Sequence, residues 1–233
     1  MTSAGSPVYA FQKNPTMVDY PGHLAAIYFV SGCNFRCGFC HNAALMAVRT
    51  TGMPWDQVEA SCKQFKRNWV DAVVITGGEP TLSPELPDLV RLFKGHGFIV
   101  KLDTNGSRPD MLRSLLAEVD YVAMDVKCGP GRYPALTGFS DTAKLTESIG
   151  LIKTGDGDYE FRTTVIDTVH TDTEMAAIGE WIREARRYVL QPFVPREDLP
   201  DIALRTTLRT SAERMKQLQS LMQPYADEVL CRE

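Results

Sequence analysis

Short apolar segments alternate with amphipathic ones along nearly the whole chain, and this alternation limits the folds open to it. Runs rich in β-branched and aromatic residues predict six strands and a weak seventh, at 24–30, 72–75, 98–102, 121–126, 159–166, 188–191 and 228–230. Helical periodicity separates them, at 54–67, 84–94, 109–118, 141–153, 171–186 and 211–223. Strands joined by helices pair in parallel, so the pattern predicts an open doubly wound sheet or an incomplete α/β barrel.

The 233 residues suit one such domain with a large core. We expect a flexible N-terminal leader over residues 1–15 and a single domain over residues 16–233. No stretch approaches 18 uncharged apolar residues and the leader lacks a secretory pattern, so the sequence predicts a cytoplasmic protein with no membrane partner. The net charge of −4 argues against nucleic acid as a partner, because nucleic-acid-binding domains usually carry a basic surplus.

Polar residues follow several predicted strands at the point where each strand ends. Thr76-Gly77-Gly78-Glu79-Pro80 follows the second strand, Asp103-Thr104-Asn105 ends the third, and Asp125-Val126-Lys127 ends the fourth. The fifth strand carries Arg162. The carboxyl ends of parallel strands form one face, where α/β proteins build their active sites. The placement therefore favours an enzyme or a cofactor-binding protein over a structural protein.

Three of the six cysteines lie within eight residues, in the pattern Cys33-x3-Cys37-x2-Cys40. Without a secretory signal, such thiols are free, metal-bound or catalytic. A structural zinc site needs four ligands, and no further nearby pair of cysteines completes one. A [4Fe–4S] cluster bound by three cysteines would leave one iron open for a cofactor or a substrate. A zinc-binding module and three unremarkable thiols remain as alternatives.

This cysteine pattern, with the aromatic Phe39 before the last cysteine, resembles the cluster signature of the radical S-adenosylmethionine (SAM) superfamily. The resemblance implies a [4Fe–4S] cluster on Cys33, Cys37 and Cys40, with SAM bound to the open iron. In this family the reduced cluster splits SAM, and a 5′-deoxyadenosyl radical takes a hydrogen atom from the substrate. It also implies a single-domain, TIM-like partial (β/α)6 barrel and an oxidoreductase activity.

Further motifs are similar to SAM-binding elements of this superfamily. Gly77-Gly78-Glu79-Pro80 matches its GGEP motif, whose glycines let the backbone approach a ligand and whose Glu79 would accept a hydrogen bond from the SAM ammonium. A common turn is the alternative for this motif. The resemblance implies that Lys127 pairs with the SAM carboxylate, and a surface ion pair is the alternative. The other residues expected near SAM are Asp103, Thr104, Asn105, Asp125 and Arg162. The resemblance also allows a monovalent cation near two of them, Asp103 and Asp125.

The segment Asp19-Tyr20-Pro21-Gly22 resembles an element of the enzymes that activate glycyl-radical enzymes, nearest to the activating proteins of anaerobic ribonucleoside-triphosphate reductase. The resemblance implies that the chain makes a glycyl radical on a partner, anaerobic ribonucleotide reductase, with electrons from flavodoxin or ferredoxin. Phe193-Val194 stands where formate-lyase-type enzymes carry an aromatic–His pair, which weakens assignment to formate lyase itself. The alternative is a radical SAM enzyme acting on a small molecule, such as a 7-carboxy-7-deazaguanine synthase-like enzyme.

Overall fold

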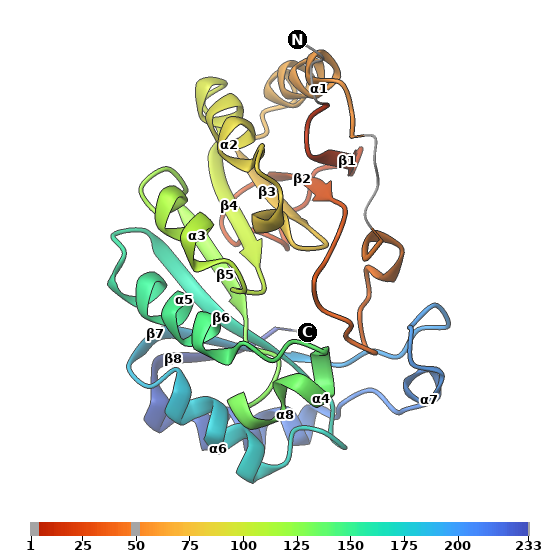
Figure 1. Cartoon of the computed structure of the whole chain (residues 1–233), viewed down its shortest axis with the longest axis vertical. Coiled ribbons are helices and arrows are strands. Elements are labelled where there is room, and N and C mark those ends of the chain that lie inside the picture. Colours follow the sequence, from red (N-terminus) through yellow and green to blue (C-terminus); the bar gives the residue numbers. More distant parts are fainter. Residues whose placement is uncertain (1–4, 48–51, 233) are drawn as a thin grey trace.

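Eight strands form one sheet whose spatial order, β1 to β8, is also their order in the sequence (Figure 1). The computed structural model describes residues 5–47 and 52–232. β1 is antiparallel to β2, and each later neighbouring pair is parallel. The strands are β1 Val8–Phe11, β2 Ala25–Val30, β3 Ala72–Gly77, β4 Ile99–Thr104, β5 Tyr121–Asp125, β6 Asp158–Val165, β7 Ala185–Pro192 and β8 Ala226–Cys231.

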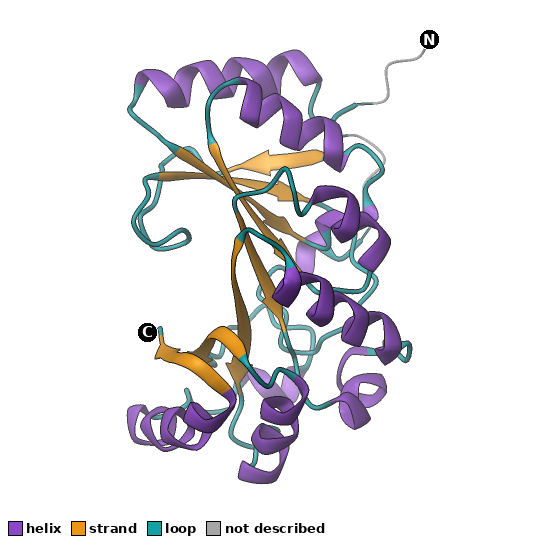
Figure 2. Ribbon diagram, turned by 90° about the vertical axis from the view of Figure 1, so that its left-hand side faces the viewer, coloured by secondary structure: helices purple, strands orange, loops and turns teal. Residues whose placement is uncertain are grey.

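The helices of the parallel crossovers cover the outer face of the sheet (Figure 2). They are α1 Trp55–Arg67, α2 Leu86–Gly95, α3 Pro109–Leu115, α5 Thr142–Thr154, α6 Asp172–Trp181 and α8 Ala212–Met222; two short helices, α4 Tyr133–Thr137 and α7 Ile202–Arg205, lie in loops. A doubly wound sheet reverses its strand order part-way, whereas this order never reverses. The partial barrel is therefore confirmed, with β1 and β8 as its unpaired edges among the described residues.

Alternation along the strands separates two layers of apolar packing. On β3, Val73 and Ile75 point to the large core beneath the helices, whereas Ala72 and Val74 point to a small cluster on the concave face. Both faces of the parallel strands are thus covered, which explains why they are almost continuously apolar. No helix in the described ranges has the length and apolarity needed to cross a bilayer.

The segment that contains Asp19-Tyr20-Pro21-Gly22 covers part of the concave face. Tyr20 is buried there, with its ring 5.4 Å from that of Tyr121 on β5. The Lys101 ammonium, on β4, donates a hydrogen bond of 2.5 Å to the Asp19 carbonyl. This motif therefore closes part of the barrel interior and brings Asp19 to the active face.

The structure differs from the expected flexible leader over residues 1–15. Residues 8–11 form β1, which pairs with β2 at the edge of the sheet, and Val8 is fully buried. The physical reason is that these four residues are apolar or aromatic, and two of them, Val8 and Phe11, pack against the core. Residues 1–4 of the expected leader lie outside the described residues.

Candidate active site

A cavity of about 350 Å³ lies at the carboxyl ends of the parallel strands. Gly77, Thr104 and Asp125 are the last residues of β3, β4 and β5, and all three line it. Twelve of the fourteen residues expected from the sequence line this cavity: Cys33, Cys37, Phe39, Cys40, Gly77, Gly78, Asp103, Thr104, Asn105, Asp125, Lys127 and Arg162. The other two, Glu79 and Pro80, are buried beside it.

The three cysteines of the loop between β2 and α1 line one side of the cavity. Burial raises the pKa of the Cys33 thiol to about 11 and that of the Cys37 thiol to about 12, so both are protonated at neutral pH. Among the described residues, no three Cys, His, Asp or Glu side chains are already arranged as a metal site. Ligation would therefore require deprotonation, because the thiolate is the metal-binding form.

Hydrogen bonds from side chains at the end of β4 hold the cysteine loop in place. Asn105 donates to the Asn34 side-chain oxygen (3.0 Å), and Asn34 donates in turn to the Ser107 hydroxyl (2.9 Å). The Asn105 amide also lies 3.9 Å from Cys33 Sγ, and the Phe35 amide lies 3.4 Å from the same sulfur. Cys33 Sγ thus has two nearby N–H donors, which favour its thiolate.

Gly77 and Gly78 are required by the close approach of the chain just before Cys33. A Cβ atom at Gly78 would lie 2.1 Å from the Gly32 carbonyl oxygen, and one at Gly77 would lie 2.3 Å from that of Val30. The backbone amides of Gly78 and Glu79 donate to those same two carbonyls, at 2.8 and 2.7 Å. The two glycines therefore join the end of β3 to the start of the cysteine loop.

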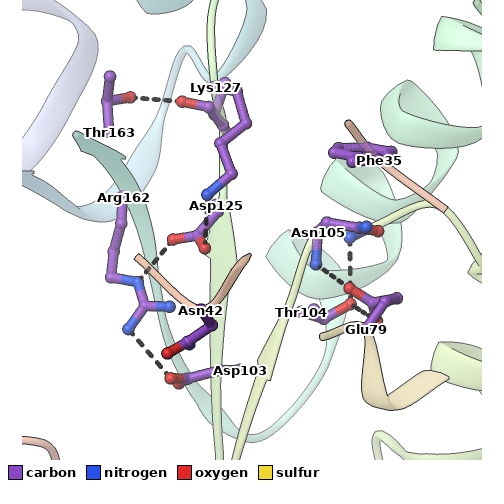
Figure 3. A network of polar contacts seen from close by, with 12 residues as sticks. Phe35, Asn42, Glu79, Asp103, Thr104, Asn105, Asp125, Lys127, Arg162 and Thr163 are labelled. Atoms are coloured by element: carbon purple, nitrogen blue, oxygen red, sulfur yellow. Dashed lines mark hydrogen bonds and ion pairs between the residues drawn. The ribbon is translucent and has the colours of Figure 1, made fainter. Parts of the chain in front are cut away.

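Glu79 is almost fully buried and connects two strand ends. Its carboxylate accepts hydrogen bonds from the Thr81 amide and hydroxyl, from the Thr104 hydroxyl (2.7 Å) and from the Asn105 amide (2.5 Å). Burial raises the pKa of Glu79, and these hydrogen bonds oppose the rise. Contact between Glu79 and the SAM ammonium remains a prediction from the sequence, since this carboxylate faces the β3 and β4 ends here (Figure 3).

A series of alternating charges also borders the cavity (Figure 3). Lys127 and Arg162 each lie 2.9 Å from one oxygen of Asp125. Arg162 also lies 3.4 Å from Asp103, and Lys101 lies 3.2 Å from the other Asp103 oxygen. Three positive side chains and two carboxylates therefore alternate in this series.

The two carboxylates of this series differ in how well they are satisfied. Burial opposes ionisation of Asp125, but the charges of Arg162 and Lys127 outweigh it and lower its pKa to about 2. Asp103 Oδ1 is buried without a hydrogen bond from any described residue. Both oxygens of Asp125 therefore have hydrogen-bonded cationic partners, whereas Asp103 Oδ1 is held only by its ion pair with Lys101.

Residues 194–210, which we name the strap, cross from β7 to α8 and pack against the cysteine loop. The Asp201 amide donates to the Gly38 carbonyl (3.0 Å), and a Cβ atom at Gly38 would lie 2.8 Å from the Asp201 Cβ. His41 bonds through Nε2 to the Val194 carbonyl (3.0 Å) and stacks on Phe193. The strap therefore supports the cysteine loop on the side away from β3.

Several lining residues were not singled out from the sequence. Asp19, Thr164 and Gln191 border the cavity as well. Thr164 lies two positions after Arg162 on β6, so strand alternation could have identified it. Gln191 is the last residue of the strand expected at 188–191, but no role was assigned to it. Asp19 belongs to the Asp19-Tyr20-Pro21-Gly22 motif, which was used only to choose a branch of the family.

Comparison with known proteins identifies the family. A family model described as the radical SAM superfamily matches residues 27–185. The chain belongs to the radical SAM superfamily. A protein of Methanocaldococcus jannaschii, provisionally named a glycyl-radical enzyme activating enzyme, is 31% identical over 92% of this chain and 91% of its own length. The pyruvate formate-lyase-activating enzyme of Streptococcus mutans is 28% identical over 76% of this chain and 73% of its own length.

Solved radical SAM proteins share the fold. The crystal structure of Streptococcus suis SuiB with its precursor peptide SuiA superposes with a TM-score of 0.69, at 15% identity, over 88% of this chain and 47% of that one. The resemblance to the activating branch, inferred from motifs, is confirmed by the relatives, and the chain is an enzyme of the radical SAM oxidoreductase type.

The radical SAM family implies a [4Fe–4S] cluster and SAM, and the residues around the cavity fit both. Three thiols from one loop are the soft ligands that iron–sulfur clusters take. The Lys127 ammonium, which lines the cavity, suits a carboxylate, and the carboxylates that line it suit an ammonium group.

Proposed function

We propose that this chain is a radical SAM activase that cleaves SAM reductively and generates a glycyl radical on a partner enzyme, anaerobic ribonucleotide reductase. The observation that carries the proposal is that three cysteines of one loop and the charged series from Lys127 to Asp103 border the same cavity. The names of relatives that match most of the chain support the activase function. When bound, the cluster supplies one electron to SAM, and the resulting deoxyadenosyl radical takes a Cα hydrogen from a glycine of the partner.

The residues of this chain have separate tasks in the proposal. Cys33, Cys37 and Cys40 would hold three irons of the cluster. Lys127 would receive the SAM carboxylate, because its ammonium lines the cavity. Glu79 would accept a hydrogen bond from the SAM ammonium, and Asp103 would lie near the methionyl group of SAM. The other residues that would shape or hold the same site are Phe39, Gly77, Gly78, Pro80, Thr104, Asn105, Asp125 and Arg162.

The monovalent cation expected near Asp103 and Asp125 is the part of the proposal with the least support. Both oxygens of Asp125 are paired with positive side chains, and Lys101 lies 3.2 Å from Asp103 Oδ1. Electrostatic repulsion from three positive groups opposes a fourth. SAM cleavage that rises when potassium replaces a bulky organic cation would support a cation site, and equal rates in both buffers would contradict it.

The chemistry is tested on anaerobically reconstituted protein. We expect a reduced-cluster signal in electron paramagnetic resonance that shifts with SAM, together with formation of 5′-deoxyadenosine. Cys37→Ala should abolish both. Cys62→Ala is the matched control, because Cys62 is an equally buried thiol that lies under β2 and contacts Tyr28 rather than the cavity. Deoxyadenosine formation by the Cys37 variant at the wild-type rate would refute the cluster assignment.

The partner is tested separately. Reduced activase and SAM are mixed with anaerobic ribonucleotide reductase, with reduced flavodoxin or ferredoxin as the electron donor. A glycyl radical signal, lost when the reductase glycine is replaced by alanine, is the expected result. Deoxyadenosine without a protein radical would leave the radical SAM chemistry intact and reject this partner in favour of another protein or a small molecule.

A further inference from the structure

Lys127 lies just beyond the end of β5, where no strand neighbour fixes its backbone. Side chains from other elements take this role. The Lys127 amide donates to the Tyr133 hydroxyl (2.8 Å), and His170 bonds through Nε2 to the Lys127 carbonyl (2.9 Å). Tyr133 and His170 are both fully buried. The two peptide planes that flank the Lys127 Cα are therefore held from both sides.

The neighbouring backbone groups are fixed in the same manner. The Thr163 hydroxyl donates to the Val126 carbonyl (2.6 Å), and the Gly129 amide donates to Glu174 on α6 (2.6 Å). Residues from β6, α4, α6 and the segment before α6 thus converge on three of the four residues from 126 to 129. Such a density of side-chain-to-backbone bonds is unusual for a surface connection, because loops commonly bond to water or to themselves.

The hydrogen bonds of His170 define which of its nitrogens carries the proton. The Ile166 amide donates to His170 Nδ1 at 2.9 Å, whereas the Ile166 carbonyl lies farther from it, at 3.3 Å, so the shorter contact favours Nδ1 as the acceptor. Nε2 then carries the hydrogen and donates it to the Lys127 carbonyl. Burial lowers the pKa of His170, which is consistent with a neutral ring in this role.

Tyr133 connects this backbone clamp to the cysteine loop. Its ring packs edge-on against Phe35, two residues after Cys33, with centroids 6.0 Å apart. The same side chain therefore contacts the loop that carries the thiols and bonds to the backbone of Lys127.

We propose that Tyr133 and His170 are positioning residues that fix the backbone dihedrals of Lys127 and so aim its ammonium at Asp125 and the cavity. The proposal deepens the proposed function, because it rests on Lys127 as the receptor of the SAM carboxylate. Fixed direction matters here, since a lysine side chain has four rotatable bonds and loses entropy when it is held in one geometry. Neither residue lines the cavity, so both would act through Lys127.

Two variants and two controls test the clamp. Tyr133→Phe keeps the ring against Phe35 but removes the acceptor of the Lys127 amide, and His170→Leu removes the donor to its carbonyl. Tyr28→Phe is the matched control, because the buried Tyr28 hydroxyl bonds to Ser61, outside the cavity. His170→Gln is the rescue variant, since its side-chain amide can still donate to the Lys127 carbonyl.

Two measurements need no turnover. The first is hydrogen–deuterium exchange at the Lys127 amide, which should be faster in Tyr133→Phe than in wild type and Tyr28→Phe. The second is the dissociation constant for SAM on the oxidised, reconstituted protein. We expect this dissociation constant to rise about fivefold in Tyr133→Phe and His170→Leu, the factor typical of one lost hydrogen bond. In separate turnover assays, KM should rise with it, and kcat should stay within twofold of wild type. His170→Gln should lie near wild type.

The outcomes separate the clamp from the function on which it rests. If Tyr133→Phe and His170→Leu bind SAM as wild type does, or if Tyr28→Phe weakens binding equally, the clamp is refuted. If wild-type protein binds no SAM, the proposed function fails. In that case the exchange rate of the Lys127 amide still decides whether Tyr133 holds it.

Discussion

Gly78 shows how a single missing side chain fixes the position of the cysteine loop. A methyl group there would lie 2.1 Å from the Gly32 carbonyl oxygen, which belongs to backbone and cannot rotate away. This glycine, expected to let the backbone approach a ligand, therefore makes room for its own chain. The loop that carries the thiols depends on this contact for its starting position.

We expect Gly78→Ala to displace the cysteine loop and to lower iron incorporation several-fold. Gly95→Ala is the control, because nothing lies within 4 Å of a Cβ atom at that position, at the end of α2. Alanine should stabilise the helix there by about 0.5–1 kcal/mol. Iron content and the midpoint of thermal unfolding are the measurements. Wild-type iron content in the Gly78 variant would contradict the role given to this contact.

Asp125 predicts a pH dependence of stability. Its folded-state pKa of about 2 lies below the ordinary value of 3.8, so the unfolded chain takes up a proton first as pH falls. Its stabilisation is complete above pH 3.8 and is lost as pH falls through the folded pKa. The contribution at neutral pH is on the order of 2 kcal/mol.

Urea unfolding at pH values from 5 to 2 measures this contribution of Asp125 to the free energy of unfolding. We expect the free energy of unfolding of wild type to fall more steeply over that range than that of Asp125→Asn, because asparagine cannot titrate. Equal slopes would mean that Arg162 and Lys127 do not favour the ionised carboxylate as the geometry indicates.

The strap and the cysteine loop behave as one unit, because each supplies backbone partners to the other. We expect Gly38→Ala to push the strap away, since the added Cβ would lie 2.8 Å from the Asp201 Cβ. Trypsin should then cut faster after Arg196, Arg205 and Arg209, which are exposed on the strap. Gly131→Ala is the control, because a Cβ atom there meets nothing within 4 Å. Unchanged cleavage in both variants would show that the strap holds independently of Gly38.

The main helices and strands could be predicted from the sequence because each has its own periodicity. Helix α1 was expected at 54–67 and is found at Trp55–Arg67. The short elements β1, α4 and α7 were missed, since four or five residues carry too little periodic signal. Their formation depends on distant contacts, as when the cysteine loop bonds to Thr137 at the end of α4.

The candidate site could likewise be predicted only in part from the sequence. The fourteen residues expected at the site sit in recognisable motifs of the cysteine loop and the strand ends, and twelve of them line the cavity. The partners of those residues could not be predicted. Tyr133 and His170 are ordinary in the sequence, and only the fold brings them to Lys127. That Glu79 would join two strand ends also required the structure, because Thr104 and Asn105 lie 25 and 26 residues further along the chain.

The open barrel is fastened across its concave face near the C-terminus. Arg232, which follows β8, places two guanidinium nitrogens 2.7 and 2.5 Å from the two carboxylate oxygens of Glu160 on β6. Glu160 is fully buried and also accepts a hydrogen bond from the Tyr121 hydroxyl. This contact reaches past β7, so it supports the curvature of three strands at once.

We expect Arg232→Leu to lower the free energy of unfolding by about 3–5 kcal/mol, because it leaves a buried carboxylate without its cation. Adding Glu160→Gln should restore part of the loss by removing the charge. Arg183→Leu, which breaks an exposed pair with Glu180, should change stability little. Urea denaturation measures all three, and a loss in Arg232→Leu no larger than in Arg183→Leu would contradict the fastening role.

The sequential strand order also has a consequence for synthesis on the ribosome. Each strand pairs with the one made just before it, so the sheet can grow as the chain emerges. The cysteine loop is different, since His41 bonds to Val194, 153 residues later. Its thiols are made early but receive their last backbone support when the strap is translated. The layout of the chain therefore predicts that a cluster would be inserted only after almost the entire barrel has folded.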